Sequence, residues 1–379
     1  MSNIPKLRFP EFKGEWEEKR FSEIVYLENE RDVCKKSDYI TTENLNKDYA
    51  GVTFNTNSNE IVPGIKYLKD DILFGNIRPY LKKVWQADRN GCVNSDVLVF
   101  KIIKDNSKFI YNIICSDLFL SHVMNGAKGT KMPRGDKNQM MDFIAKIPSL
   151  PEQQKIADFL SNVDSIITAE TKILNTLQKK KKALMQKLFT RQLRFKSDDG
   201  KDFPAWEEKK LGECVEILDS QRKPIESKER ANRKGEYPYY GASGIIDYID
   251  DYLFEGEAIL LGEDGANIIN RNSRLAFIAT GKYWVNNHAH IMKANADNLN
   301  HFICEYLESL DYSKICAGSA QPKLTQDVIR NLTIKAPCKE EQQKIADCLS
   351  SLDSLIQTQQ KVVTTWQQQK KALLQQMFI

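Results

Sequence analysis

Apolar residues recur at alternating intervals of four and three positions over two long stretches, Ile156–Leu188 and Ile345–Met377. A seam of this kind, sustained over about five heptads, predicts a long coiled-coil helix in each stretch. The natural partner of each helix is the other one, in antiparallel orientation; the alternative is that each seam packs only onto its own globular domain. The seam residues are Ile156, Leu160, Val163, Ile167, Leu174, Leu177, Leu184, Leu188, Ile345, Leu349, Leu352, Ile356, Val363, Trp366, Leu373 and Met377.

Polar residues interrupt both seams at corresponding places. They are Glu170 and Lys181 in the first stretch and Gln359 and Lys370 in the second. Antiparallel pairing then predicts a register in which Glu170 lies near Lys370 and Lys181 lies near Gln359.

The chain also repeats itself. The segment Glu152–Asp158 recurs letter for letter as Glu341–Asp347, an offset of 189 residues. At the same offset, the glycine-containing stretch that ends at Pro133 aligns with one that ends at Pro322. Because the ends of the two copies match while their middles diverge, we interpret the chain as an internal duplication.

Short apolar runs separated by glycine and asparagine turns fill the segment before each long helix. Residues 72–74 and 97–100 are typical of strands, and residues 109–123 and 299–310 predict a helix late in each segment. We therefore expect an α+β fold: two pseudo-symmetric mixed α/β domains joined by two long antiparallel coiled-coil helices. The expected boundaries are 1–150 for the first domain, 151–192 for the first long helix, 193–205 for a linker, 206–337 for the second domain and 338–379 for the second long helix.

The overall composition says little about function, and the distribution of charged residues along the chain says more. The 379 residues include 55 Lys and Arg against 51 Asp and Glu, a net charge of +4, which is too small a surplus to indicate a nucleic-acid partner by itself. The 8 cysteines form no Cys-x-x-Cys pair, which is typical of buried thiols in a reducing compartment. The first residues contain no apolar signal core, so we expect a soluble cytoplasmic protein.

Motifs for catalysis are missing from the sequence. No Gly-x-Gly-x-x-Gly opens a helix after a strand, and neither a Walker-type phosphate loop nor a Gly-x-Ser-x-Gly motif occurs. His288 and His290 could share one face of a strand, but no third ligand stands at a recognisable spacing. We therefore expect no metal site, and packing or DNA contact is the favoured role of these histidines.

Basic residues gather in the divergent part of each copy. One cluster, Lys128, Lys131 and Arg134, lies in a glycine-rich loop, and a second run covers residues 222–234. Loops rich in Arg, Lys, Asn and Gln suit phosphate positioning and hydrogen bonding to base edges. The competing interpretation is an ordinary solvated surface.

Four groups of residues together match a known family. They are Pro151–Ala157 with its second copy, Trp16-Glu17 with Trp206-Glu207, Asp71–Pro79 and Tyr239–Ile246. With this pattern the chain resembles, over essentially its whole length, the specificity subunit of type I restriction-modification enzymes. The second copy departs from the first by an insertion at Cys338–Glu340, a minor change at the start of the helix.

The resemblance implies a division of labour. The two domains would be target-recognition domains that read the two halves of a split site in double-stranded DNA, and the long helices would set their spacing. The helices would also bind two methyltransferase (modification) subunits, which carry S-adenosylmethionine, and restriction (motor-nuclease) subunits with ATP and Mg would join them. This chain would bind no cofactor and would be the non-catalytic subunit of an adenine-specific DNA methyltransferase and endonuclease complex.

Alignment with that family places the expected DNA-binding residues in loops of both domains. They are Arg78, Lys82, Lys128, Lys131 and Arg134 in the first and Gln221, Arg222, Lys223, Ser243, Asn267, Gln321 and Lys323 in the second. Two other hypotheses stand beside this one: a duplicated coiled-coil adaptor that binds proteins without sequence-specific DNA contact, and an enzyme whose site is assembled from scattered residues.

Overall fold

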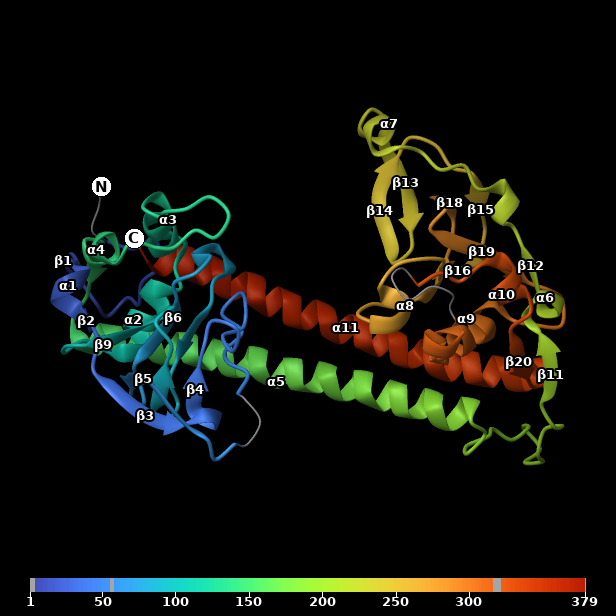
Figure 1. The fold of residues 1–379 in the computed structure, drawn as a ribbon, viewed down its shortest axis with the longest axis horizontal. Coiled ribbons are helices and arrows are strands. Elements are labelled where there is room, and N and C mark those ends of the chain that lie inside the picture. Colours follow the sequence, from blue (N-terminus) through green and yellow to red (C-terminus); the bar gives the residue numbers. More distant parts are fainter. Residues whose placement is uncertain (1–3, 55–57, 316–321, 379) are drawn as a thin grey trace. The chain divides into compact units, whose positions relative to one another are not determined.

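The computed structural model describes the chain in three stretches (Figure 1). They are residues 4–54, 58–315 and 322–378.

The described residues form two compact units, each a mixed α/β domain with a part of both long helices. Unit 1 comprises Met1–Thr171 and Lys361–Ile379, and unit 2 comprises Lys172–Gln360. Helix α5 spans Leu150–Phe189 and helix α11 spans Lys339–Met377. The division between the units therefore crosses both helices.

The described part of unit 1 contains two four-stranded sheets and a two-stranded ribbon. Its strands are β1 (Glu17–Arg20), β2 (Val25–Leu27), β3 (Arg31–Lys35), β4 (Tyr39–Ile40), β5 (Ile61–Tyr67), β6 (Ile72–Gly75), β7 (Val84–Gln86), β8 (Gly91–Val93), β9 (Val97–Ile102) and β10 (Ile144–Ile147). The first sheet has the order β2-β9-β6-β7 with antiparallel neighbours, and the second has the order β3-β5-β8-β4 with β4 parallel to β8. Strands β1 and β10 form the ribbon.

Strand β6 explains why the sequence shows unbroken apolar runs. Ile72 and Phe74 belong to one hydrophobic cluster, whereas Leu73 belongs to another on the opposite face of the sheet. Strand β9 alternates in the same way, with Val99 on one side and Phe100 on the other. A strand covered on both faces needs apolar side chains at every position, so the predicted strands at 72–74 and 97–100 are confirmed.

The helical segments of unit 1 are short apart from α5 and α11. They are α1 (Phe21–Ile24), η1 (Lys36–Asp38), η2 (Pro79–Leu81), α2 (Ser107–Ile114), α3 (Asp117–Asn125) and α4 (Lys137–Met141). The single helix predicted over 109–123 is therefore wrong: Ser116 accepts a hydrogen bond from Phe119 N at 3.2 Å and begins a second helix. A serine cap interrupts an apolar periodicity that by itself continues across the break.

Unit 2 repeats the plan of unit 1. Its strands are β11 (Glu207–Lys210), β12 (Val215–Ile217), β13 (Lys234–Gly241), β14 (Gly244–Ile249), β15 (Phe254–Glu255), β16 (Ala258–Gly262), β17 (Ala276–Ala279), β18 (Lys282–Val285), β19 (Ala289–Ala294) and β20 (Thr333–Ala336). Its helical segments are α6 (Leu211–Cys214), η3 (Asp219–Gln221), α7 (Ser227–Ala231), α8 (Asn267–Asn270), α9 (Asn300–Ser309), η4 (Tyr312–Lys314) and α10 (Gln326–Arg330). Helix α9 confirms the prediction over 299–310.

One sheet has the same strand order in both units, and the other sheet differs between them. The order β12-β19-β16-β17 matches β2-β9-β6-β7, and the ribbon β11-β20 matches β1-β10. The remaining sheet is β14-β13-β18-β15, in which β13 runs parallel to β18, whereas the corresponding partner β5 runs antiparallel to β8. The difference in strand topology between the copies therefore lies in the second sheet of each domain.

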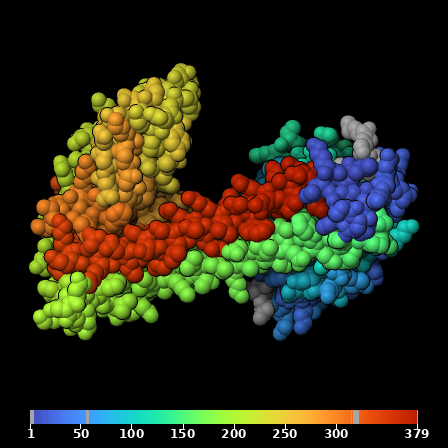
Figure 2. All heavy atoms as spheres, turned by 180° about the vertical axis from the view of Figure 1, so that it is seen from behind, coloured from blue at the N-terminus to red at the C-terminus, as the bar shows by residue number. Residues whose placement is uncertain are grey.

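Helices α5 and α11 pack side by side in opposite directions (Figures 1 and 2). In unit 1 the core contains Leu160 near the start of α5 and Met377 at the end of α11. In unit 2 it contains Leu188 at the end of α5 and Leu349 near the start of α11. All sixteen predicted seam residues are buried or half-buried. Within the described residues, no helix has both the length and the apolar character needed to span a membrane.

The register predicted for the helix pair is wrong. Lys370 Nζ lies 2.6 Å from Asp164 Oδ1, and Lys181 Nζ lies 2.7 Å from Asp353 Oδ2. Each lysine thus meets an aspartate six positions before the polar residue that we expected, Glu170 or Gln359. The two ion pairs correspond to each other under the repeat offset of 189, so the same contact recurs in each unit.

The repeated Glu-Gln-Gln segment fastens the start of each long helix to its domain. Glu152 is buried and receives a two-pronged hydrogen bond from Arg8, at 2.7 and 2.8 Å, and a third bond of 3.3 Å from Trp16 Nε1. The next residue, Gln153, accepts from Asn106 N at 2.9 Å, just before helix α2. These bonds explain why the same letters recur at both helix starts.

Unit 2 contains the same arrangement. Glu341 is buried and accepts hydrogen bonds from Arg194, at 3.1 and 2.7 Å, and from Trp206 Nε1 at 3.1 Å. Gln342 accepts from Leu299 N at 3.0 Å, just before helix α9. The paired tryptophans of the repeat are therefore structural residues at the junction of helix and domain.

Candidate nucleic-acid interface

In unit 1, a glycine-containing loop is fastened to the turn that follows strand β6; we call residues 126–135 the clasped loop. Arg78 N donates a hydrogen bond to the Pro133 carbonyl at 2.7 Å, and Gly135 N donates to the Asn76 carbonyl at 3.3 Å. Because backbone groups make these bonds, the side chains of the loop can vary without loss of its attachment.

Three predicted DNA-binding cations lie on the clasped loop. Lys128 Nζ lies 2.6 Å from Asp136, Arg134 Nη2 lies 3.0 Å from Asp96, and Lys131 is exposed. The hydrogen bond between Lys128 and Asp136 raises the pKa of the lysine and lowers that of the carboxyl, so both are charged at neutral pH. Ion pairs open to solvent are weak, so a phosphate can compete for these cations.

An open pocket of about 500 Å³ lies beside the clasped loop. Its lining residues are Asn76, Lys128, Arg134, Gly135, Asp136, Lys137 and Asn138. Cations and amides around one hollow provide donors for phosphate oxygens and both donors and acceptors for base edges.

The other two predicted cations of unit 1 flank η2. Arg78 is half-buried, and none of the described residues forms an ion pair with it. Lys82 Nζ, by contrast, lies 3.2 Å from Asp117 and 5.8 Å from the centre of the Tyr49 ring. Lys82 therefore ties η2 to helix α3, which leaves Arg78 as the freer of the two.

Unit 2 holds the corresponding segments with the same backbone bonds. Gly265 N donates to the Pro322 carbonyl at 3.2 Å, and Leu324 N donates to the Glu263 carbonyl at 2.8 Å. Pro322 and Leu324 are the repeat equivalents of Pro133 and Gly135. The clasp is thus a shared feature of the two domains.

Three predicted residues of unit 2 are exposed, namely Gln221, Lys223 and Ser243. Asn267 instead uses its side chain within the fold, because its Oδ1 accepts from Ser273 N at 2.9 Å and its Nδ2 donates to the Ser273 carbonyl at 3.1 Å. Asn267, the first residue of helix α8, therefore holds the turn that follows this helix.

Arg222 does not present a free cation at the surface. Its side chain is 13% exposed, and Nη1 lies 2.9 Å from Glu263 and 2.7 Å from the Ala289 carbonyl. Lys323 Nζ also lies 3.1 Å from Glu263, although half of its side chain is exposed. Gln321 lies outside the described residues.

Much of the basic run at 222–234 is neutralised by acids on strand β14 or just after it. Lys234 Nζ lies 2.6 Å from Asp247, and Arg233 Nη2 lies 3.0 Å from Asp250. The sequence contains a sign of this neutralisation, because an acidic run follows the basic run along the chain. The number of basic residues therefore overstates the positive charge of this segment.

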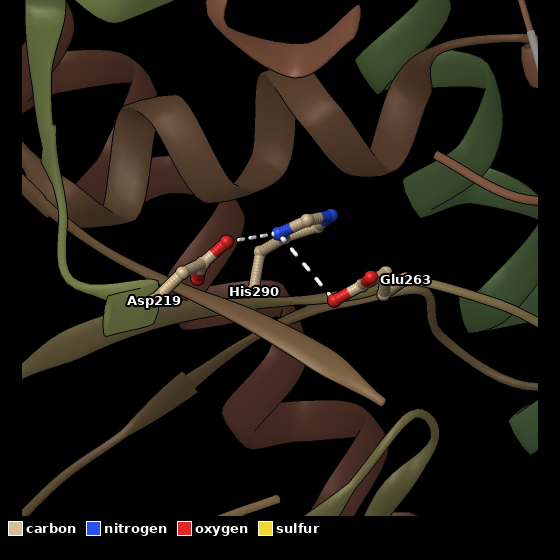
Figure 3. A group of neighbouring side chains, drawn as sticks. All are labelled: Asp219, Glu263 and His290. Atoms are coloured by element: carbon tan, nitrogen blue, oxygen red, sulfur yellow. Dashed lines mark hydrogen bonds and ion pairs between the residues drawn. The ribbon is translucent and has the colours of Figure 1, made fainter. Parts of the chain in front are cut away.

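Three ionisable side chains of unit 2 meet in the interior (Figure 3). His290 Nδ1 lies 2.5 Å from Asp219 Oδ2 and 3.8 Å from Glu263 Oε2, and its Nε2 lies 2.8 Å from the Leu324 carbonyl. Carboxylate and carbonyl oxygens only accept hydrogen bonds, so each ring nitrogen of His290 faces a hydrogen-bond acceptor. His290 thereby holds Leu324, at the end of the clasp.

The three side chains are close enough to share a metal ion, since their ligand atoms lie within 4.8 Å of one another. Basic side chains already occupy the carboxylates, however: His290 binds Asp219, and Arg222 and Lys323 bind Glu263. Burial acts to raise the pKa of both carboxyls, but these partners outweigh it and lower both pKa values below their usual range. The arrangement therefore fits an ion network better than a metal site.

Arg8 and Arg194, which hold the two buried glutamates, were not among the predicted functional residues. The signal was a second repeat, because Leu-Arg-Phe occurs at residues 7–9 and again at 193–195. The two copies of Leu-Arg-Phe are not separated by 189 residues, because the segment between the arginine and the tryptophan is longer in the second copy. A search for repeats at a fixed offset of 189 therefore does not find this one.

Comparison with known proteins also finds two copies of one kind of domain in the chain. The family model of the type I restriction modification DNA specificity domain matches twice, at residues 13–179 and 205–365. The MjaVIII specificity subunit of Methanocaldococcus jannaschii is 25% identical over 415 residues, which cover 97% of this chain and 92% of that protein. A putative type I restriction enzyme specificity subunit of Haemophilus influenzae is 35% identical over 147 residues, 39% of this chain and 37% of the relative.

Solved structures agree on the fold. The crystal structure of the S subunit of a type I restriction-modification system from M. genitalium superposes with a TM-score of 0.63 at 16% identity and covers 99% of both chains. A chain from a study of complex assembly in the type I system gives a TM-score of 0.55 at 15% identity, covering 95% of this chain and 96% of the other. With two family-model matches that together cover most of its length, this chain belongs to the family of type I restriction-modification DNA specificity subunits.

Proposed function

We propose that the chain reads a split site in double-stranded DNA and that each domain contacts one half of that site. The observation that carries this proposal is the recurrence of the clasp with different side chains. Arg78 and Asn76 stand in unit 1 where Gly265 and Glu263 stand in unit 2, on the same backbone bonds. A common frame with different surface chemistry suits the reading of two different half-sites.

The chemistry would belong to partner subunits. Two methyltransferase subunits with S-adenosylmethionine would bind the long helices, and restriction subunits with ATP and Mg would complete the assembly. Support comes from apolar side chains left exposed on these helices, Ile173 at 47% and Leu355 at 55%. In the proposed assembly a methyltransferase subunit would cover these two side chains.

Genome-wide mapping of methylated adenines tests this proposal. The chain is co-expressed with methyltransferase subunits of the family in a host without its own adenine methylation. A methylated motif with two specified parts and an unspecified gap is the expected result, and it disappears when this chain is omitted. Methylation without sequence preference would favour the adaptor hypothesis, and methylation by the chain alone would favour the enzyme hypothesis.

A further inference from the structure

Arg78 has a backbone conformation that arginine rarely adopts. Its φ of 51° and ψ of 63° lie in the left-handed region, and the residue precedes Pro79. Both facts are unfavourable, because a Cβ crowds the left-handed region and a following proline restricts the preceding residue to extended conformations.

The repeat shows which residue the fold would accept at this place. The corresponding position in unit 2 is Gly265, with a φ of 102° and the same bond from its N–H to the carbonyl of a proline, Pro322. Glycine satisfies the clasp there without steric cost. The arginine in unit 1 is therefore not explained by the needs of the backbone.

The strain around Arg78 is not isolated. Asp48, Tyr49 and Lys82 also have positive φ values, of 55°, 60° and 55°. They are joined to one another, since Asp48 N donates to the Leu81 carbonyl at 3.1 Å and Tyr49 N donates to the Lys82 carbonyl at 2.9 Å. Strained residues gather at functional sites, where the surrounding structure holds them for a purpose.

The guanidinium of Arg78 belongs to a half-buried side chain that forms no ion pair with any described residue. Its Nε is buried and makes no hydrogen bond, and no acid among the described residues pairs with the side chain. The neighbouring cations Arg134 and Lys128 have Asp96 and Asp136. A partly desolvated, unpaired guanidinium favours a planar acceptor with two oxygens or with an oxygen and a nitrogen.

We propose that Arg78 is the main DNA anchor of the first domain, and that the strained turn is retained because it aims this guanidinium at a two-point acceptor on the duplex. The acceptor is either a backbone phosphate or the O6 and N7 atoms of a guanine, which share this chemistry. This inference rests on the proposed function and adds a named contact to it.

Three variants of the full chain, assembled with its methyltransferase subunits, test the inference. R78G removes the side chain and relieves the backbone strain. R78K keeps the positive charge but loses the paired N–H donors of the guanidinium. D70G is a control that relieves strain at another residue of unit 1 with a positive φ, Asp70 at 73°. The probes are a duplex with the mapped motif and duplexes substituted at each position of the first half-site.

With R78G we expect the melting temperature to stay the same or to rise by up to about 4 °C, because glycine suits this backbone. The affinity for the motif should fall at least about tenfold, since one two-point contact is lost. The affinity of R78K should lie between those of R78G and the original chain, and D70G should keep the original affinity.

A guanine contact would appear as lost discrimination at one position of the half-site. A phosphate contact would appear as an equal loss on all duplexes, with a salt dependence reduced by about one unit of slope.

Unchanged DNA affinity in R78G overturns the inference, as does a loss of affinity that follows a loss of melting temperature or of binding to the methyltransferase subunits. The proposed function fails separately, when the original assembly methylates no split motif.

Discussion

Replacing Glu341 by glutamine removes a negative charge from a fully buried site that binds Arg194 and Trp206. The variant should lower the free energy of unfolding of unit 2 by about 2 kcal/mol, because the guanidinium loses its carboxylate where solvent replaces it poorly. Urea unfolding measures the change. E340Q is the matched control: Glu340 is exposed in the same helical turn and should change stability by no more than about 0.5 kcal/mol. Equal losses in the two variants would contradict the assigned role.

Asp219 should make the stability of unit 2 depend on pH. Burial favours its neutral form, but the hydrogen bond with His290 prevails and lowers the pKa of the carboxyl. A lowered folded-state pKa supplies stability above the unfolded value of about 4, and this stability is lost as the pH falls through the folded value. D219N should therefore cost about 2 kcal/mol at pH 7 and progressively less below about pH 4.

Urea midpoints between pH 3 and pH 7 measure that difference. D264N is the control, because Asp264 lies 2.8 Å from an exposed histidine, His288, and should contribute little. A D219N deficit that does not change with pH would show that packing, rather than charge, is responsible.

Lys128 and Lys131 should act together through phosphates if the clasped loop meets DNA. K128A/K131A should weaken binding on all duplexes alike and reduce the slope of log affinity against log salt by about two units. Binding titrations at several salt concentrations measure the slope, with K13A as a control at an exposed lysine outside the loop. An unchanged slope would remove both lysines from the interface.

At the scale of elements, the helix pair shows what an apolar seam can and cannot predict. The heptad spacing predicted both helices and a seam for contact with another helix, and the duplication of the chain predicted that the two helices pair in antiparallel orientation. It did not predict the register, because a repeating apolar seam packs in several registers that differ little in energy. The partners that decide it, Asp164 and Asp353, flank the seam next to Val163 and Leu352 and do not interrupt it.

A charge-reversal cycle tests this register. K370E should destabilise unit 1 by about 1 kcal/mol by placing two carboxylates together, and D164K should restore most of the loss. E170K serves as the control and should restore nothing, because Glu170 is not the residue that Lys370 contacts. Unfolding free energies of the four variants give the coupling. Rescue by E170K and not by D164K would mean that the other register is populated.

At the scale of the whole molecule, duplication with divergence predicts that the domains are interchangeable parts. Replacing residues 16–145 by the corresponding domain of another family member should change one half of the methylated motif and leave the other half intact. Methylation mapping, as described above, measures the motif. The reason is that the contacts of the buried residues Glu152 and Glu341 involve the same residue types in both copies. A new domain can therefore pack against the start of the long helix in the same way. A change in both halves would contradict this independence.

The sequence by itself determined the duplication, the strands at 72–74 and 97–100, the two long helices and the family, because each of these is written in local periodicity or in repeated letters. The tertiary structure decided which charges remain available. Arg222 and Lys82 looked like surface cations, but both are held by acids from distant segments, Glu263 and Asp117. The same holds for Arg78, whose unpaired guanidinium and left-handed backbone depend on the clasp with Pro133. Charge compensation and backbone strain are set by contacts between segments far apart along the chain, and such contacts exist only once the chain has folded.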